Sequence, residues 1–396
     1  MRILVCTLEV PLPPVNGMRL QVGALVNELR RRHDVRLVGL AFPDQERAGL
    51  PAPEPWMRVI RRPPGRTGRL VRNARSALLR RPPGVTEYAS ELRGTLREEL
   101  ASFRPDVVHV TPGDLALLGR ELRGRPAVFA PLDAWHENVA AEIPLATGVR
   151  RALLPIAGRF VRRFVRIEYG RFARVVTVSD EDAAALRTVA PDLLVTVIPN
   201  GVDLEFFAPA DAPRDPDLLV FSGVMDYGPN VAAARFLAED VLPLVRSARP
   251  SVRLAIVGRD PASSVVALAR HRWVDVVGTV PDMRPWLRRC SAYACPMISG
   301  TGIKNKLLEA MAVGSACVVT PLALRGTSAA PGRDVLMASG AAGLADALLA
   351  VLAHRGVAER LGASARSYVE ANHSWSAVAS RFERLYEEEV ARSSAI

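Results

Sequence analysis

The sequence predicts an α/β protein built from two Rossmann-like domains that face an interdomain cleft. Short apolar runs, typical of buried parallel strands, alternate with segments whose apolar residues recur at helical spacing. This alternation pauses at a Pro- and Asp-rich stretch, residues 199–217, and then starts again. The chain has 396 residues, which is too long for one ordinary core. We therefore expect one domain on each side of a linker near residue 205.

The first domain is predicted over residues 1–204. Its opening unit is a strand at 2–6, a helix at 18–32 entered through Gly17, and a strand at 33–42. Strand-like apolar runs follow at 106–110, 127–130, 174–179 and 194–199.

The second domain is predicted over residues 205–373. Its apolar runs lie at 218–223, 253–258, 274–280, 292–297 and 316–320, and helical segments separate them. A strong helix pattern over 374–390 follows this domain. In open parallel sheets, ligands bind beyond the carboxyl ends of the strands, so the turns after these strands are the places to search for a site.

The net charge of +11 comes from arginine. Residues 58–81 contain nine arginines and no acid, and a second basic stretch runs over 150–174. Such stretches attract the phosphates of lipids or nucleotides, and solvated helix faces are the alternative. Nucleic acid is disfavoured, because aromatic residues do not interleave with the arginines.

The remaining composition favours a cytoplasmic protein with no metal. No apolar run approaches the roughly 18 residues of a membrane span, and the start of the chain does not resemble a signal peptide. Four scattered cysteines have no metal-ligand spacing, so we expect reduced thiols.

Residues 299–314, SGTGIKNKLLEAMAVG, form the most informative stretch. They follow a strand-like run at 292–297 and predict a glycine-rich turn and then a helix that begins near Ile303. A helix N-terminus presents unpaired N–H groups and partial positive charge. Gly300 and Gly302 would let the backbone approach an anion closely, so the turn is a candidate phosphate site.

Helical spacing separates the polar residues of this stretch. Lys306 and Glu309 fall away from the apolar sector, whereas Lys304 falls at its edge. We expect Lys306 to neutralise phosphate and Glu309 to accept hydrogen bonds from hydroxyl groups. The alternative is that Lys306 and Glu309 form only a surface pair at i, i+3.

Several motifs in order resemble family-4 retaining glycosyltransferases of the GT-B fold. The donor segment GTGIKNKLLEAMAVG is the strongest. The others are the entrance P-x-x-G, VVTVSDEDAAALR, PNGVD, FSGVMDYGPN, AIVGRDP and VVGTVPDM. The resemblance covers most of the chain and implies that the last helix, about 374–396, returns to the first domain.

The resemblance implies a nucleoside-diphosphate sugar bound mainly by the second domain, with UDP as the expected nucleotide and no cofactor or metal. It implies that Glu309 holds the ribose, that the amides at 301–303 and a lysine hold the diphosphate, and that the turn at 278–280 meets the base. The catalytic candidates are His136, Lys306 and Glu309. The donor-binding candidates are Gly17, Gly223, Asn230, Gly278, Thr279, Val280, Thr301, Gly302, Ile303 and Lys304.

The acceptor is expected against the first domain. The family often places a sugar-contacting histidine after a strand of this domain; His136 matches it, and Asp133 competes for the role. The acceptor-side candidates are Asn16, Arg19, Asp133 and Asn200. Arg19 is alternatively a surface residue, and Asn200 alternatively shapes a turn.

Two positions depart from the family pattern. Thr301 stands where many members carry a second glutamate, and residues 223–230, GVMDYGPN, lack the usual arginine and lysine. Thr301 favours one rival function, a non-catalytic partner of the same fold. A sugar-nucleotide epimerase of the GT-B fold is the other rival, but it would need catalytic acids and bases that do not appear at matching positions. A dehydrogenase is disfavoured because no G-x-G-x-x-G follows residues 2–6.

The acceptor class stays open. A lipid-linked or cell-envelope glycan would suit a peripheral enzyme whose arginines at 58–81 meet an anionic membrane at its cytoplasmic face. A soluble natural product is the competing acceptor.

Overall fold

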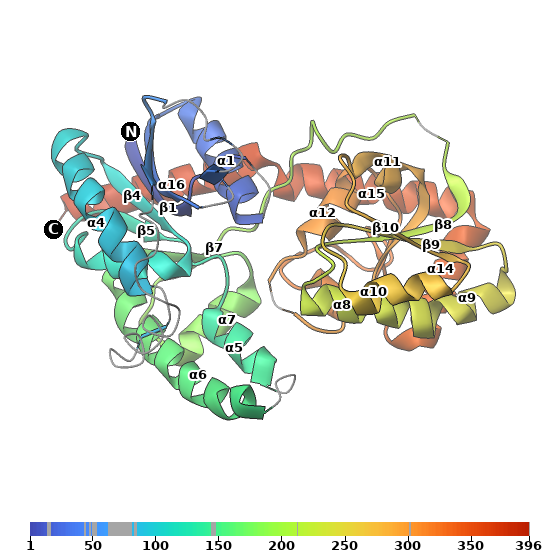
Figure 1. Ribbon diagram of the computed structural model, residues 1–396. Coiled ribbons are helices and arrows are strands. Elements are labelled where there is room, and N and C mark those ends of the chain that lie inside the picture. Colours follow the sequence, from blue (N-terminus) through green and yellow to red (C-terminus); the bar gives the residue numbers. More distant parts are fainter. Residues whose placement is uncertain are drawn as a thin grey trace. The chain divides into compact units, whose positions relative to one another are not determined.

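The computed structural model confirms the predicted α/β class with two Rossmann-like units (Figure 1). Unit 1 comprises Met1–Pro199 and Val378–Ile396, and unit 2 comprises Asn200–Ala377. The predicted boundaries, after residue 204 and before residue 374, lie close to these. The structure describes residues 1–13, 17–42, 45–46, 49, 54–61, 81–82, 85–143, 148–211, 213–300 and 302–395.

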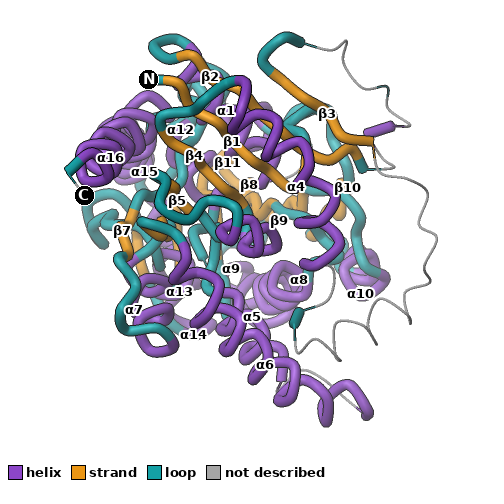
Figure 2. Tube along the Cα trace, turned by 90° about the vertical axis from the view of Figure 1, so that its left-hand side faces the viewer, coloured by secondary structure: helices purple, strands orange, loops and turns teal. Residues whose placement is uncertain are grey.

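Unit 1 contains a seven-stranded parallel sheet in the order β3-β2-β1-β4-β5-β6-β7. Figure 2 shows β2, β1 and β4 running alongside one another. The strands are β1 (Arg2–Glu9), β2 (Asp34–Ala41), β3 (Met57–Arg61), β4 (Val107–Thr111), β5 (Ala127–Phe129), β6 (Arg174–Thr177) and β7 (Val195–Val197). The chain order reverses between β1 and β4, which makes this pair the switch point of the sheet.

Helices pack on this sheet through apolar faces, as the helical spacing predicted. They are α1 (Gly17–Arg30), α4 (Val85–Ser102), α5 (Trp135–Glu142), α6 (Gly148–Glu168), α7 (Asp180–Val189) and α16 (Trp375–Ser394), with 3₁₀ turns at Gly113–Arg120 and Tyr169–Arg171. From Val378 onward, α16 belongs to unit 1. Tyr386 of α16 bonds the Nδ1 atom of buried His109 at 2.7 Å, and Glu389 pairs with Arg174. The last helix therefore returns to the first domain, as the resemblance implied.

Unit 2 contains a six-stranded parallel sheet in the order β10-β9-β8-β11-β12-β13. Its strands are β8 (Asp215–Ser222), β9 (Arg253–Val257), β10 (Val274–Gly278), β11 (Cys290–Cys295), β12 (Cys317–Val319) and β13 (Leu336–Met337). Strands β9, β11 and β12 and the second half of β8 are largely buried, because helices cover both faces of the sheet, whereas the edge strands β10 and β13 are partly exposed (Figure 1). The switch point lies between β8 and β11.

The helices of unit 2 complete the two outer layers. They are α8 (Gly228–Arg235), α9 (Leu242–Ala248), α10 (Ser263–Val266), α11 (Arg284–Arg289), α12 (Asn305–Ala312), α13 (Pro321–Leu324), α14 (Gly340–Ala353) and α15 (Arg355–His373), with a π turn at Phe236–Val241 and a 3₁₀ turn at Ala267–Arg270. Among the described residues no single helix is long and apolar enough to cross a membrane, and the bent pair α14 and α15 passes that test together.

The structure corrects one part of the charge analysis. Arg58 and Arg61 do not lie on a helix face but in strand β3, which the sequence analysis missed. Arg58 donates to Glu98 and Glu99 of α4, both at 2.9 Å, so its charge is engaged inside unit 1. Arg62, Arg66, Arg69, Arg72, Arg75 and Arg80 lie outside the described residues.

Candidate functional site

Loops with no regular structure meet at the switch point of unit 2. Gly223 follows β8 directly, and residues 296–304 connect β11 to α12. Because β8 and β11 are adjacent and parallel, their carboxyl ends bring these two loops together. This is the place in the fold where the glycine-rich turn was predicted to hold an anion.

Three glycines at the ends of neighbouring strands set the spacing of these loops. The Gly223 N–H donates to the Val257 carbonyl at 3.1 Å, and the Gly258 N–H donates to the Gly278 carbonyl at 2.9 Å. A Cβ atom on Gly258 would lie 1.7 Å from the Gly223 carbonyl oxygen. Only glycine fits there, so the loops after β8, β9 and β10 are locked against one another.

Lys306, on the first turn of α12, turns its ammonium group into this region. Its Nζ atom donates to Asn230 Oδ1 of α8, lies 3.9 Å from Met297 Sδ and stands 5.0 Å above the Phe221 ring. Asn230 is fixed in turn by its Nδ2 bond to the Val224 carbonyl at 2.9 Å. Burial lowers the pKa of Lys306 to about 8.

Glu309 lies near Lys306 on the same helix. Burial raises the pKa of its carboxyl to about 7, although the Lys306 ammonium opposes the shift. Within the described part of the chain, no hydrogen bond to this carboxylate is formed. The pKa values of this half-buried carboxyl and this half-buried ammonium lie close to neutral pH, so the two groups differ from the exposed surface pair considered from the sequence, and their role in binding a ligand stays a prediction.

The loop before α12 differs from the prediction in one respect. Helix α12 begins at Asn305 rather than near Ile303, because the backbone of Lys304 is not helical. Lys304 Nζ donates to the Gly302 carbonyl at 2.6 Å and is buried. The amides of Gly302 and Ile303 therefore belong to the loop, with Gly300 and Gly302 at positive φ, and Thr301 lies outside the described residues.

A compositional signal for this site escaped the sequence analysis. The chain has 52 lysines and arginines, yet its only two lysines are Lys304 and Lys306. Arginine supplies the basic side chains everywhere else, so two lysines at the junction of this loop and α12 mark the stretch as a candidate site for a compact ammonium group with an adjustable pKa.

The turn that was predicted to meet the base ends strand β10. Gly278 adopts φ +77° and accepts the Gly258 N–H, while Thr279 is exposed and Val280 packs against the core of unit 2. The backbone of this turn is held by the same glycine contacts that fix Gly223.

Asn200 was predicted on the acceptor side. It belongs to unit 2, where its Nδ2 atom donates to Asn305 Oδ1 at 3.1 Å and its carbonyl accepts from His373 Nδ1 at 2.8 Å. Asn200 therefore supports the start of α12, beside the donor-binding candidates.

The candidates of unit 1 gather at its own switch point and the next strand ends. Gly17 is exposed as the first residue of α1, and Asn16 lies outside the described residues. Arg19 is not a surface residue, since it is 2% exposed and its Nε donates to Glu9 Oε2 at 2.5 Å. Its charge is thus engaged by the residue that ends β1.

Asp133 and His136 follow β5. Asp133 accepts a bond from Asn138 Nδ2 at 2.8 Å, and burial raises its pKa to about 6. His136 lies on the first turn of α5, not in a loop, and its Nε2–H donates to the Ala185 carbonyl at 3.1 Å. Burial lowers its pKa, and its Nδ1 atom has no hydrogen-bond partner among the described residues. The ring is held by the backbone and leaves Nδ1 as an acceptor.

The described residues contain no group of three or more His, Cys, Asp or Glu that would hold a metal ion. All four cysteines are buried thiols.

Comparison with known proteins assigns a family to both halves of the chain. The model described as Glycosyltransferase Family 4 matches residues 15–206, and the model described as Glycosyl transferases group 1 matches residues 216–354. Phosphatidyl-myo-inositol mannosyltransferase of Mycobacterium tuberculosis is 34% identical over 206 residues, which cover 48% of this chain and 53% of the relative. The chain thus spans about half the length of that curated relative.

Solved structures share the fold over nearly the whole chain. Sucrose-phosphate synthase from Thermosynechococcus elongatus matches with a TM-score of 0.71 and 18% identity, covering 99% of this chain and 100% of that one. Anabaena Alr3699/HepE in complex with UDP-glucose matches with a TM-score of 0.65 and 13% identity, covering 98% and 99%. With the two family models, these matches confirm that the chain belongs to the group 1, family-4-like glycosyltransferases of the GT-B fold.

Proposed function

We propose that the protein is a retaining glycosyltransferase that moves a hexosyl group from a nucleoside-diphosphate sugar to an acceptor hydroxyl. The observation that carries the proposal is the group formed by Lys306, Asn230 and Glu309 at the switch point of unit 2. An ammonium beside a glycine-rich loop suits a diphosphate, and a carboxylate farther along the same helix suits a ribose.

The proposed reaction does not require a protein side chain to form a covalent bond with the sugar. In the retaining reaction expected for this family, a donor phosphate oxygen takes the acceptor proton on the face from which the diphosphate departs. Lys306 and the loop amides would stabilise the negative charge that grows on the diphosphate, and the loops would position the donor. Neither a cofactor nor a metal enters this proposal.

Calorimetry with UDP, GDP and ADP tests the donor site. UDP is the first choice, because HepE, which shares the fold, was solved with UDP-glucose. We expect one of the three to bind at one site per chain. A chain that binds none of them would contradict the donor site and favour the non-catalytic alternative.

The lysine pair offers a second and more local test. The N-terminus, Lys304 and Lys306 are the only primary amines that acetylation at pH 8 to 9 can modify, and mass spectrometry distinguishes the two lysines after substitution of either residue. Bound nucleotide should protect Lys306. If a nucleotide binds in calorimetry but Lys306 is acetylated equally with and without it, the diphosphate does not bind at Lys306.

Product analysis separates the enzyme from its rivals. Incubation with a UDP-sugar should release UDP and yield a glycoside when an acceptor is present. Formation of an epimeric UDP-sugar would instead support the epimerase.

We propose a lipid-linked or cell-envelope acceptor at the cytoplasmic face of the membrane, because the curated relative is named a phosphatidyl-myo-inositol mannosyltransferase. A soluble acceptor is the alternative, and lipid extracts and soluble glycosides used in parallel decide between them.

A further inference from the structure

The exposed face of α6 combines arginines with apolar side chains. Five arginines of this helix are exposed: Arg151, Arg159, Arg162, Arg163 and Arg166. Among the residues that the structure describes, none of the five forms an ion pair. Three large apolar residues are exposed beside them, namely Leu153 at 56%, Ile156 at 46% and Ile167 at 39%.

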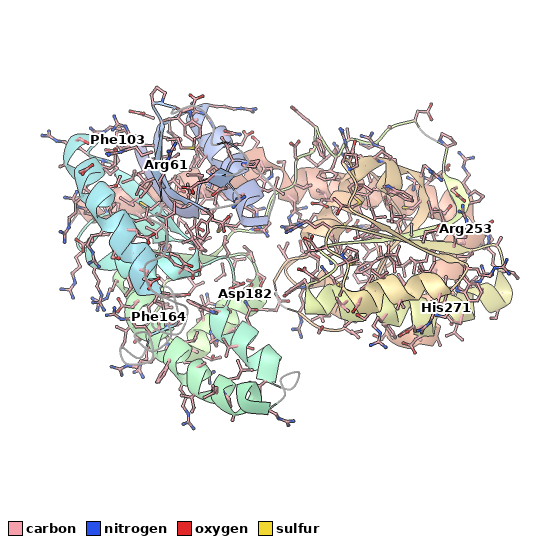
Figure 3. The ribbon with its side chains drawn as sticks, in the orientation of Figure 1. Arg61, Phe103, Phe164, Asp182, Arg253 and His271 are labelled. Carbon is pink, nitrogen blue, oxygen red and sulfur yellow. The ribbon has the colours of Figure 1, made fainter. Side chains whose placement is uncertain are left out.

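These side chains are sorted around the helix. At 100° per residue the arginines occupy an arc of roughly 120°, and Ile156, Ile167 and Leu153 occupy roughly the next 60° to 80°. The remaining face packs on unit 1 through Val161, Phe164 and Val165, which are at most 3% exposed; Figure 3 labels Phe164. The helix therefore has a buried apolar face and an exposed outer face, and the outer face is divided into a basic strip and an apolar strip.

The single acid in α6 does not neutralise this face. Glu168 is buried and accepts hydrogen bonds from Arg120 and Arg171. A basic strip bordered by an apolar strip, along a helix of 21 residues, fits an interface whose surface is anionic and whose interior is apolar. An acidic protein surface would pair with the arginines, but it offers no apolar interior for the exposed apolar strip, as a bilayer does.

We propose that α6 is a docking surface for an anionic lipid bilayer, with Arg159, Arg163 and Arg166 at the headgroups and Ile156 and Ile167 at the acyl boundary. The proposal does not depend on sugar transfer. It places the membrane contact beside His136, since Arg162 is close enough to lower the pKa of that histidine. A lipid-linked acceptor would thus arrive next to a residue predicted on the acceptor side.

Vesicle flotation of the full chain tests the proposal. The probes are vesicles of phosphatidylcholine alone and vesicles that also contain phosphatidylglycerol, each at low and high salt. We expect binding only to the anionic vesicles and a marked loss at high salt. Each basic residue near an anionic surface strengthens binding about fivefold, so Arg159→Gln, Arg163→Gln and Arg166→Gln together should weaken binding on the order of 100-fold at low salt.

Matched variants make the result specific to α6. Arg272→Gln, Arg360→Gln and Arg384→Gln remove the same charge from exposed sites elsewhere and should change binding little. Ile156→Ser with Ile167→Ser should weaken binding while leaving its salt dependence intact. Circular dichroism checks that each variant is folded.

Three outcomes would overturn the proposal. The first is no binding to anionic vesicles at low salt, which would also favour an acidic protein as the partner of this face. The second is an equal loss for the α6 and control variants, which would indicate attraction by net charge alone. The third is a loss only with Arg66→Gln, Arg69→Gln and Arg72→Gln, which would assign the membrane contact to residues 58–81.

Discussion

The two units have the same kind of sheet but opposite chemistry at their switch points. In unit 2 the loop after β11 carries Lys304, the first turn of α12 carries Lys306, and glycines follow β8, β9 and β10. In unit 1 the segments after β4 and β5 carry the carboxyls of Asp114 and Asp133, while Glu9 at the end of β1 is paired with Arg19. One fold thus provides a cationic edge and an acidic edge within a chain of net charge +11. Topology fixes where a ligand can bind, whereas the loop residues decide which ligand it is.

The comparison suggests a division of labour. An ammonium with a pKa of about 8 suits an anionic diphosphate. Asp114 and Asp133 are half-buried carboxyls whose pKa values are raised by burial, and they suit a neutral, hydroxyl-bearing ligand, because carboxyl oxygens accept hydrogen bonds from hydroxyl groups. We therefore expect substitutions in unit 2 to affect the donor and substitutions in unit 1 to affect the acceptor.

The largest effect is expected from the lysine and the glutamate of α12. Lys306→Ala and Glu309→Ala should each lower kcat/KM. The loss of transition-state stabilisation should be roughly 1–3 kcal/mol, the scale of a lost hydrogen bond to a charged group. Nucleotide affinity should fall with the same variants. Arg272→Ala removes an exposed cation from unit 2 and serves as the control. Folded variants of both residues with normal kcat/KM would break the assignment of the donor to unit 2.

Gly223 tests whether the spacing of the loops matters. A Cβ atom there would lie 2.7 Å from Asn230 Nδ2 and 3.0 Å from Lys306 Nζ, so Gly223→Ala must displace both groups. We expect nucleotide affinity to fall by about 1–2 kcal/mol, the scale of an overpacked contact. Gly228→Ala, five residues later at the start of α8, is the matched control, because a Cβ atom at Gly228 meets no atom within 4 Å. Equal affinities for the two variants would mean that the ammonium is not required in its present position.

Much of this architecture could be predicted from the sequence, because buried parallel strands give continuous apolar runs. The runs at 218–223 and 253–258 became β8 and β9 with small changes at their ends. Strand β3 was missed because arginines surround and occupy it, and their ion pairs with α4 are tertiary contacts. Strand β13 has two residues, too few for any periodicity.

The site was harder to predict than the sheets. Helical spacing separated Lys306 and Glu309 from the apolar sector, but it could not show that Asn230, 76 residues away, binds the ammonium. Nor could it show that Arg19 is neutralised by Glu9 or that Asn200 supports α12. Such contacts depend on which strand ends become neighbours, and local sequence does not contain that information.

The pH dependence of stability should reveal the contribution of the half-buried carboxyl of Glu309 in unit 2. The pKa of Glu309 is raised from 4.5 to about 7 by folding, so this group favours the folded state below about pH 4.5 and loses that contribution as pH rises to about 7. Lys306 stays protonated across this window, because its lowered pKa is about 8. The nucleotide-free protein should therefore lose on the order of 1–3 kcal/mol of unfolding free energy between these pH values. Thermal melts of Glu309→Gln should lack that component, and identical pH profiles for the variant and the parent would contradict it.

The smallest effect is expected in unit 1, where Asp133→Asn sharpens the contrast between the two edges. Asparagine keeps the shape and an acceptor oxygen but removes the charge, so one hydrogen bond should weaken by about 0.5–1.5 kcal/mol. The KM for the acceptor should rise severalfold, while nucleotide affinity measured by calorimetry and donor hydrolysis without acceptor should not change. Asp106→Asn, which alters a carboxylate paired with Arg2 at the start of β1, controls for the loss of one negative charge in unit 1. A change in nucleotide affinity with Asp133→Asn would indicate that both units bind the donor, and it would contradict the assignment of the donor to unit 2 and the acceptor to unit 1.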